Sequence, residues 1–128
     1  MNAAARSEWA RAVRCLESAQ LLLDSGDPDS AASRAYYGVF HAATAFFLSE
    51  GVEFGKHEAV ETAVHRDLVR TGRISRELGS AYSGLRELRL VGDYGLDESV
   101  TIEDARDALT RARAFLAALR ALDTDHRG

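Results

Sequence analysis

The sequence has little of what β-rich or disordered chains require. Its 128 residues include a single proline, Pro28, and only ten glycines. A β-sandwich or a disordered chain needs more turn-forming residues than this. With one cysteine, Cys15, no internal disulfide can form, and we expect this thiol to be a small core or boundary residue. The composition therefore favours helices.

Long apolar runs are also missing. No run approaches the roughly 20 residues that a membrane-spanning helix needs, and the N-terminus, with Arg6, Glu8 and Arg11, lacks the apolar centre of a secretory signal. We therefore expect a cytoplasmic protein that makes no use of a membrane. Phosphate-binding loops, dinucleotide glycine fingerprints, His-Glu-x-x-His and paired Cys-x-x-Cys motifs are absent too, which leaves no support for a cofactor. His57 and His65 could share a helical face, but no third ligand accompanies them, so we expect no metal site.

A basic excess is missing as well, since the net charge is −4. This balance argues against non-specific nucleic-acid binding. The charges are nevertheless segregated along the chain. Residues 66–89 contain six arginines against three carboxylates, whereas residues 93–107 contain six carboxylates against one arginine. A basic middle is thus followed by an acidic segment.

What the chain does contain is helical periodicity, with apolar residues three and four positions apart. Amphipathic helices are predicted over about 4–24, from a cap at Asp29 or Ser30 to about 51, over about 57–72, over about 76–91 and from about 102 onward. Gly26 suits the positive φ that ends a helix, while Gly79 and Gly84 suggest close approach to a neighbouring helix. We predict one all-α bundle spanning residues 1–128, with an ordered core at about 4–122.

The run 33–48 is the centre of this pattern. Its buried stripe is predicted to comprise Tyr36, Val39, Phe40, Ala43, Phe46 and Phe47. A second row on the same helix carries Arg34, Tyr37 and His41. Polar groups at the edge of a core are costly without partners, so this row is the first functional candidate.

Two further candidates follow along the chain. Lys56 and His57 stand at the start of the third helix, where exposed amides and the helix dipole favour anions, although a solvated loop would look the same. Arg89 and Asp93 lie one turn apart, close enough for an ion pair, and Tyr94 follows. The structural alternative is an arginine that pins the helix end and orients the next loop.

Four segments in order resemble the HEPN domain, most closely its small stand-alone bacterial and archaeal branch. They are Arg-Ala-Tyr-Tyr-Gly-Val-Phe-His-Ala-Ala at 34–43, Lys-His at 56–57, Arg-Thr-Gly-Arg-Ile-Ser-Arg-Glu-Leu at 70–78, and Leu-Arg-x-x-x-Asp-Tyr-Gly at 88–95. The resemblance implies a four- to five-helix up-and-down bundle, usually a homodimer. It also implies a role in a toxin–antitoxin or defence pair, often beside a minimal nucleotidyltransferase. Many members of the family are metal-independent ribonucleases.

The resemblance also implies roles for particular residues. In the active members an arginine is followed about four to six residues later by a histidine, and the pair promotes attack of the ribose 2′-hydroxyl on the adjacent phosphate. Arg89 matches the arginine, but positions 90–95 hold no histidine. Asp93 and Tyr94 stand there instead as catalytic candidates, and His41 could supply the missing group if it faces the same cleft. Tyr94 also resembles the tyrosine to which a partner transfers a nucleotide in some related toxins.

Two functional hypotheses result. The first is an RNA- or nucleotide-binding protein with, at most, weak ribonuclease activity. In it Arg34, Tyr37, His41, Lys56 and His57 bind the ligand, and Arg89 meets a phosphate in a groove shared by two protomers. The second is a non-catalytic helical dimer that serves as a protein-interaction module.

Overall fold

The computed structural model describes residues 1–95 and 97–127, with side chains described as far as residue 123. The elements are α1 (Ala3–Asp24), α2 (Pro28–Ser49), α3 (His57–Ala63), the π-helical segment η1 (Val64–Val69), α4 (Arg76–Tyr94) and α5 (Ile102–Arg127). The described residues contain no strand, which confirms the all-α prediction. No helix in this part of the chain combines the length and the apolar character needed to cross a membrane.

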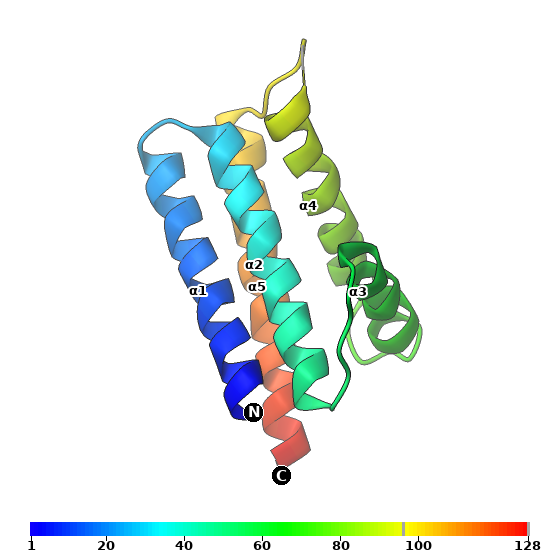
Figure 1. Ribbon diagram of the computed structural model, residues 1–128. Coiled ribbons are helices and arrows are strands. Elements are labelled where there is room, and N and C mark those ends of the chain that lie inside the picture. Colours follow the sequence, from blue (N-terminus) through cyan, green and yellow to red (C-terminus); the bar gives the residue numbers. More distant parts are fainter. Residues whose placement is uncertain (96, 128) are drawn as a thin grey trace.

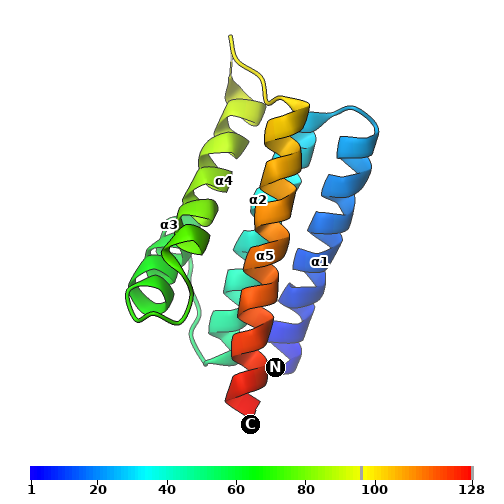
Figure 2. The ribbon, with the colours of Figure 1, turned by 180° about the vertical axis from the view of Figure 1, so that it is seen from behind.

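The four long helices run alternately up and down. Figure 1 shows α2 in front, between α1 and α4. The reverse view in Figure 2 shows α5 in front of α2, again between α1 and α4. Both chain ends lie at one end of the bundle, and the short α3 covers the outer edge near the start of α4. Helix α2 packs against α1, α4, α5 and α3. The central position expected for the run 33–48 is therefore observed.

The core is built mainly on α2. Its buried side chains include most of the predicted stripe, namely Tyr36, Val39, Ala43, Phe46 and Phe47, while Phe40 is only partly buried. Phe115 from α5 and Tyr82 from α4 are fully buried, with ring centroids 5.6 Å apart. Tyr82 in turn lies edge-on to Tyr36, with ring centroids 6.1 Å apart. A line of aromatic rings thus connects α5 through α4 to α2.

Local capping explains where the helices begin. The α2 cap is Asp27, whose side chain accepts a hydrogen bond from Ser30 N at 3.2 Å, so the expectation of a cap at Asp29 or Ser30 was wrong. Pro28 has a fixed φ that suits the first helical turn, and this moves the cap to the residue before it. Asp29 instead accepts a hydrogen bond from Val100 N at 2.8 Å, which ties the start of α2 to the segment before α5. Gly26 adopts a φ of +84°, as expected for the end of α1.

Two predicted boundaries changed. The third helix is α-helical only to Ala63 and continues as η1, and α4 extends through Gly92 to Tyr94. Gly92 does not break α4 because its missing side chain allows the helix to pass close to α2. A Cβ built there would lie 3.0 Å from the carbonyl oxygen of Asp29. Asp93 and Tyr94 are therefore helical rather than part of a loop.

Gly79 and Gly84, both inside α4, have opposite surroundings. At the buried Gly79 a Cβ would lie 2.6 Å from Val69 Cγ2, which confirms close approach to η1. At Gly84 a Cβ would meet only Arg111 Nη1, 4.0 Å away, so the prediction of close approach was wrong there. Gly84 faces an open groove between α4 and α5.

This difference predicts opposite effects of the same substitution. Gly79→Ala forces a methyl group against Val69, and such overpacking costs typically about 1–3 kcal/mol. That cost should exceed the roughly 1 kcal/mol gained from better helix propensity. Gly84→Ala gains the propensity without the clash and should stabilise the fold. Urea denaturation of both variants measures this, and a more stable Gly79→Ala protein would contradict the observed packing.

Candidate functional site

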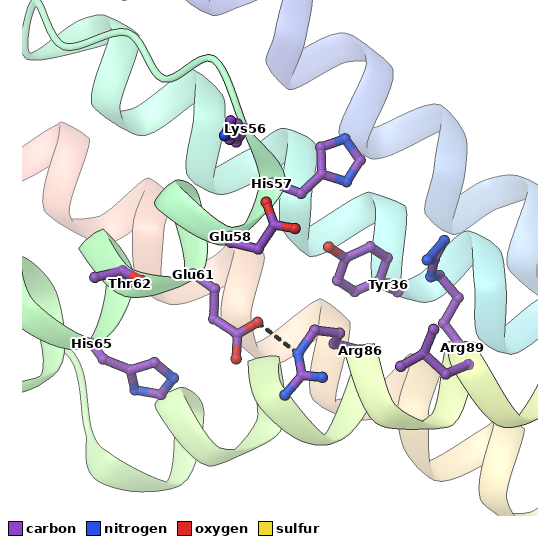
Figure 3. A pocket seen from close by; sticks show the side chains of 10 residues that line it. Tyr36, Lys56, His57, Glu58, Glu61, Thr62, His65, Arg86 and Arg89 are labelled. Carbon is purple, nitrogen blue, oxygen red and sulfur yellow. Dashed lines mark hydrogen bonds and ion pairs between the residues drawn. The ribbon is translucent and has the colours of Figure 1, made fainter.

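A cleft of about 920 Å³ opens between α2, α3 and α4 (Figure 3). Ten residues line it: Tyr36, Lys56, His57, Glu58, Glu61, Thr62, His65, Arg86, Arg89 and Leu90. Its charged side chains are three cations and two carboxylates, together with two histidines. The cleft therefore has a modest local positive excess in a chain whose net charge is −4.

Arg89 is held in place by two tyrosines of α2. Its Nη1 donates a hydrogen bond to the hydroxyl of Tyr37 at 2.8 Å. Its Cζ lies 5.3 Å and 5.4 Å from the ring centroids of Tyr36 and Tyr37, within the range of cation–π attraction. The side chain is only 18% exposed, and its buried Nε makes no hydrogen bond to a described residue. The guanidinium is thus fixed in position while it keeps unused donors.

The ion pair predicted between Arg89 and Asp93 is loose. The closest atoms, Nη1 and Oδ2, are 3.7 Å apart, which is beyond hydrogen-bonding distance. Burial disfavours the charged form of Arg89, but the hydrogen bond that Arg89 donates to Tyr37 and the nearby Asp93 outweigh it and raise the pKa of the guanidinium. Arg89 therefore stays charged without a tightly bound carboxylate that would neutralise it.

The structure brings together the two main candidate groups of the sequence. Tyr37, from the row on α2, contacts Arg89, from the end of α4. Arg34, one turn before Tyr37, places its Cζ 5.1 Å from the Tyr37 ring centroid. Two guanidinium groups thus lie within cation–π distance of one tyrosine ring, and one of them, Arg89, lines the cleft.

Lys56 and His57 enter the cleft from the start of α3. Both are exposed, and Lys56 makes no side-chain capping bond. The imidazole of His57 lies over Phe40 with ring centroids 4.0 Å apart, and its centroid is 6.2 Å from that of Tyr37. Tyr37 is therefore the common neighbour of His57 and Arg89.

Sequence reasoning missed a hydrogen-bonded chain on the other side of the cleft. Glu61 Oε1 accepts from Arg86 Nε at 2.7 Å, and Glu61 Oε2 accepts from Ser83 Oγ at 2.8 Å. His65 Nε2 lies 2.9 Å from the same hydroxyl, and because Ser83 gives its proton to Glu61, His65 must be the donor. Figure 3 shows Glu61 and Arg86 pointing toward one another across the cleft. The available signal was the spacing of Arg86 and Arg89, which puts both on one helical face.

No three or more His, Cys, Asp or Glu side chains are grouped so that they could hold a metal ion, within the residues whose placement is described.

A family model described as the HEPN domain matches residues 5–122 of this chain. The chain belongs to the HEPN-domain family. A UPF0332 protein of Thermotoga maritima is 38% identical over 118 residues, covering 91% of this chain and 89% of the relative. "Putative toxin MJ0605" of Methanocaldococcus jannaschii is 30% identical over 101 residues, covering 79% and 75% of the two chains. The crystal structure of TT1696 from Thermus thermophilus shares the fold, with a TM-score of 0.79 and 22% identity over 91% of this chain and 96% of that one.

In this HEPN domain His41 does not line the cleft, although its ring centroid is 5.1 Å from that of Phe40 and 6.3 Å from that of Tyr37. Its Nδ1 donates a hydrogen bond to Glu8 Oε2 at 2.8 Å, which ties α2 to α1. Burial lowers the pKa of His41 despite the raising effect of Glu8. Because His41 is not among the residues that line the cleft, the geometry gives no support to the idea that it replaces the missing histidine.

The two candidates that follow Arg89 do not line the cleft of this HEPN domain either. Asp93 lies on the same side of α4 as Arg89, one turn further along. Tyr94 is the last residue of α4 and is 69% exposed. Tyr94 therefore presents its hydroxyl to solvent rather than to Arg89.

Proposed function

We propose that this HEPN-domain protein binds RNA, or a nucleotide, through phosphate groups in the cleft between α2, α3 and α4. The observation that carries the proposal is Arg89, which is charged, immobilised by Tyr37 and loosely paired, and which lines an open cleft. An immobilised guanidinium loses little entropy when it binds an anion.

The surroundings of Arg89 suit a phosphate. Its planar group can donate two parallel hydrogen bonds to phosphate oxygens, a geometry that a lysine cannot reproduce. Lys56 lines the same cleft and adds positive charge, and Arg86 lines it in an ion pair with Glu61. The Arg34 Cζ lies 5.1 Å from the ring centroid of Tyr37. We assign these four cations and Tyr37 to ligand binding. The overall net charge of −4 would confine the attraction to this face of the molecule.

The family resemblance adds slow, metal-independent RNA cleavage to the proposal. Arg89 would stabilise charge that develops on the phosphate during attack by the 2′-hydroxyl. Without the histidine expected at positions 90–95, general acid–base catalysis from that position is lost. Such a loss costs about 10²–10⁴-fold in rate.

We further propose that the protein acts in the cytoplasm as one member of a toxin–antitoxin or defence-type pair, as a homodimer beside a minimal nucleotidyltransferase. The names of two archaeal relatives, both "Putative toxin", support this proposal. The exposed Tyr94 is the residue that such a partner could reach.

Fluorescence anisotropy with a labelled single-stranded RNA in EDTA tests the binding proposal. We expect saturable binding that weakens as salt is raised, because phosphate contacts release counterions. A protein that binds no RNA and copurifies instead with the product of an adjacent gene would contradict the proposal and identify an interaction module.

A further inference from the structure

We infer that His57 is the proton-transfer residue of this cleft and takes the place of the histidine that is absent after Arg89. The inference rests on the proposed function, because it assigns a residue to the cleavage of RNA bound there. It follows from the placement of His57 relative to Arg89 and from a comparison of the three histidines whose side chains are described.

His57 and Arg89 reach the same tyrosine from different helices. The His57 ring centroid is 6.2 Å from that of Tyr37, and Arg89 donates its hydrogen bond to the hydroxyl of the same residue. Both residues line the cleft. A phosphate bound by Arg89 would therefore lie on the side of the cleft where the imidazole stands.

The other two histidines have committed ring nitrogens. His41 is bonded to Glu8 and does not line the cleft. His65 uses Nε2 for Ser83, and its Nδ1 side packs against Gly79, where a Cβ would come within 3.3 Å of the ring. His57 is exposed, and neither of its ring nitrogens bonds to any residue that the structure describes.

The position of the His57 ring is nonetheless defined. Contact with the Phe40 ring, at a centroid distance of 4.0 Å and an interplanar angle of 35°, restricts the rotation of the imidazole without using its nitrogens. A catalytic base needs this combination of a fixed position and a free nitrogen. Histidine is also the side chain that most often serves as a general acid or base.

The proposed step balances without a metal ion or a co-reactant. Neutral His57 accepts the proton of a ribose 2′-hydroxyl while the 2′-oxygen forms a bond to the adjacent phosphorus. The bond from phosphorus to the 5′-oxygen of the next nucleotide breaks, and that oxygen takes the proton back from the imidazolium. The products are a 2′,3′-cyclic phosphate and a 5′-hydroxyl, and His57 is again neutral. Arg89 binds the non-bridging oxygens throughout.

The test compares His57→Gln with His41→Gln, a histidine variant outside the cleft. Cleavage and binding of one end-labelled RNA are measured in EDTA, with a 2′-deoxy version of the RNA as substrate control and circular dichroism as the check on folding. We expect His57→Gln to cleave about 10²–10⁴-fold more slowly, with nearly unchanged RNA affinity and loss of the pH dependence of cleavage that the wild type shows. His41→Gln and the wild type should cleave alike, and the deoxy substrate should stay intact.

The outcomes separate the two proposals. Cleavage by His57→Gln at the wild-type rate, or a parallel loss of RNA affinity and rate, overturns the role of His57 and leaves RNA binding in place. If the wild type binds RNA but does not cleave it, the role of His57 is likewise overturned and RNA binding remains in place. A wild-type protein that binds no RNA overturns the proposed function itself.

Discussion

Replacing Arg89 by alanine should weaken RNA binding by roughly 10- to 100-fold, which corresponds to the roughly 1.5–3 kcal/mol of a hydrogen-bonded charged group. The effect should be large because Arg89 is already held by its hydrogen bond to the Tyr37 hydroxyl and by the rings of Tyr36 and Tyr37. Its loss removes a preorganised donor rather than a mobile one. Anisotropy titrations of both proteins with the same RNA, at fixed salt, measure the difference.

Two companion variants make the Arg89 result specific. Arg89→Lys keeps the charge but loses the planar fork, so we expect an affinity between those of the wild type and the alanine variant. Arg111→Ala removes an equal charge from α5, where Arg111 is 55% exposed and paired with Asp107, and should bind RNA like the wild type. Equal weakening by Arg89→Ala and Arg111→Ala would show that only overall charge matters and would contradict a site at Arg89.

Phe115→Ala should destabilise the fold by about 3–5 kcal/mol, a large share of the roughly 5–15 kcal/mol that stabilises a typical protein. Phe115 is fully buried and packs against Tyr82, so its removal leaves a cavity where α5 meets α4. Leu21→Ala is the matched control, since Leu21 is 70% exposed and its loss should cost less than about 0.5 kcal/mol. Urea denaturation followed by circular dichroism measures both.

The Phe115 variant also tests how the site is supported. Tyr82 lies between Phe115 and Tyr36, and Tyr36 contacts Arg89. At temperatures where the Phe115→Ala protein remains folded, we expect RNA affinity to fall slightly because this aromatic support is loosened. Similar stabilities for Phe115→Ala and Leu21→Ala would contradict the observed packing.

The sequence predicted the helices well because their signals are local. Periodic apolar residues mark the buried face of α2, and Gly26 marks the end of α1. The errors arose where a distant segment decides. Gly92 stays helical because α4 passes close to Asp29. Gly84 faces open space, although it is a glycine inside the same helix as the closely packed Gly79. Neither environment is encoded within a few residues of the glycine.

The candidate site was only partly predictable for the same reason. Polar residues at the edge of an apolar stripe identified Tyr37. The one-turn spacing of Arg89 and Asp93, and then the family resemblance, identified Arg89. Their contact joins residues 52 positions apart, which no local pattern reveals. The chain of Glu61, Ser83 and His65 was missed because its members come from three elements and none has a distinctive spacing. π-Helical segments such as η1 are frequent at functional sites, but no local residue pattern indicated one here.

A crystal structure of the protein with a short single-stranded RNA, grown without divalent metal ions, tests the central claim most directly. We expect a phosphate in the cleft within hydrogen-bonding distance, about 3 Å, of the Arg89 guanidinium, with the imidazole of His57 beside the neighbouring ribose. RNA bound on another face, with Arg89 still held only by Tyr36 and Tyr37, would contradict the account.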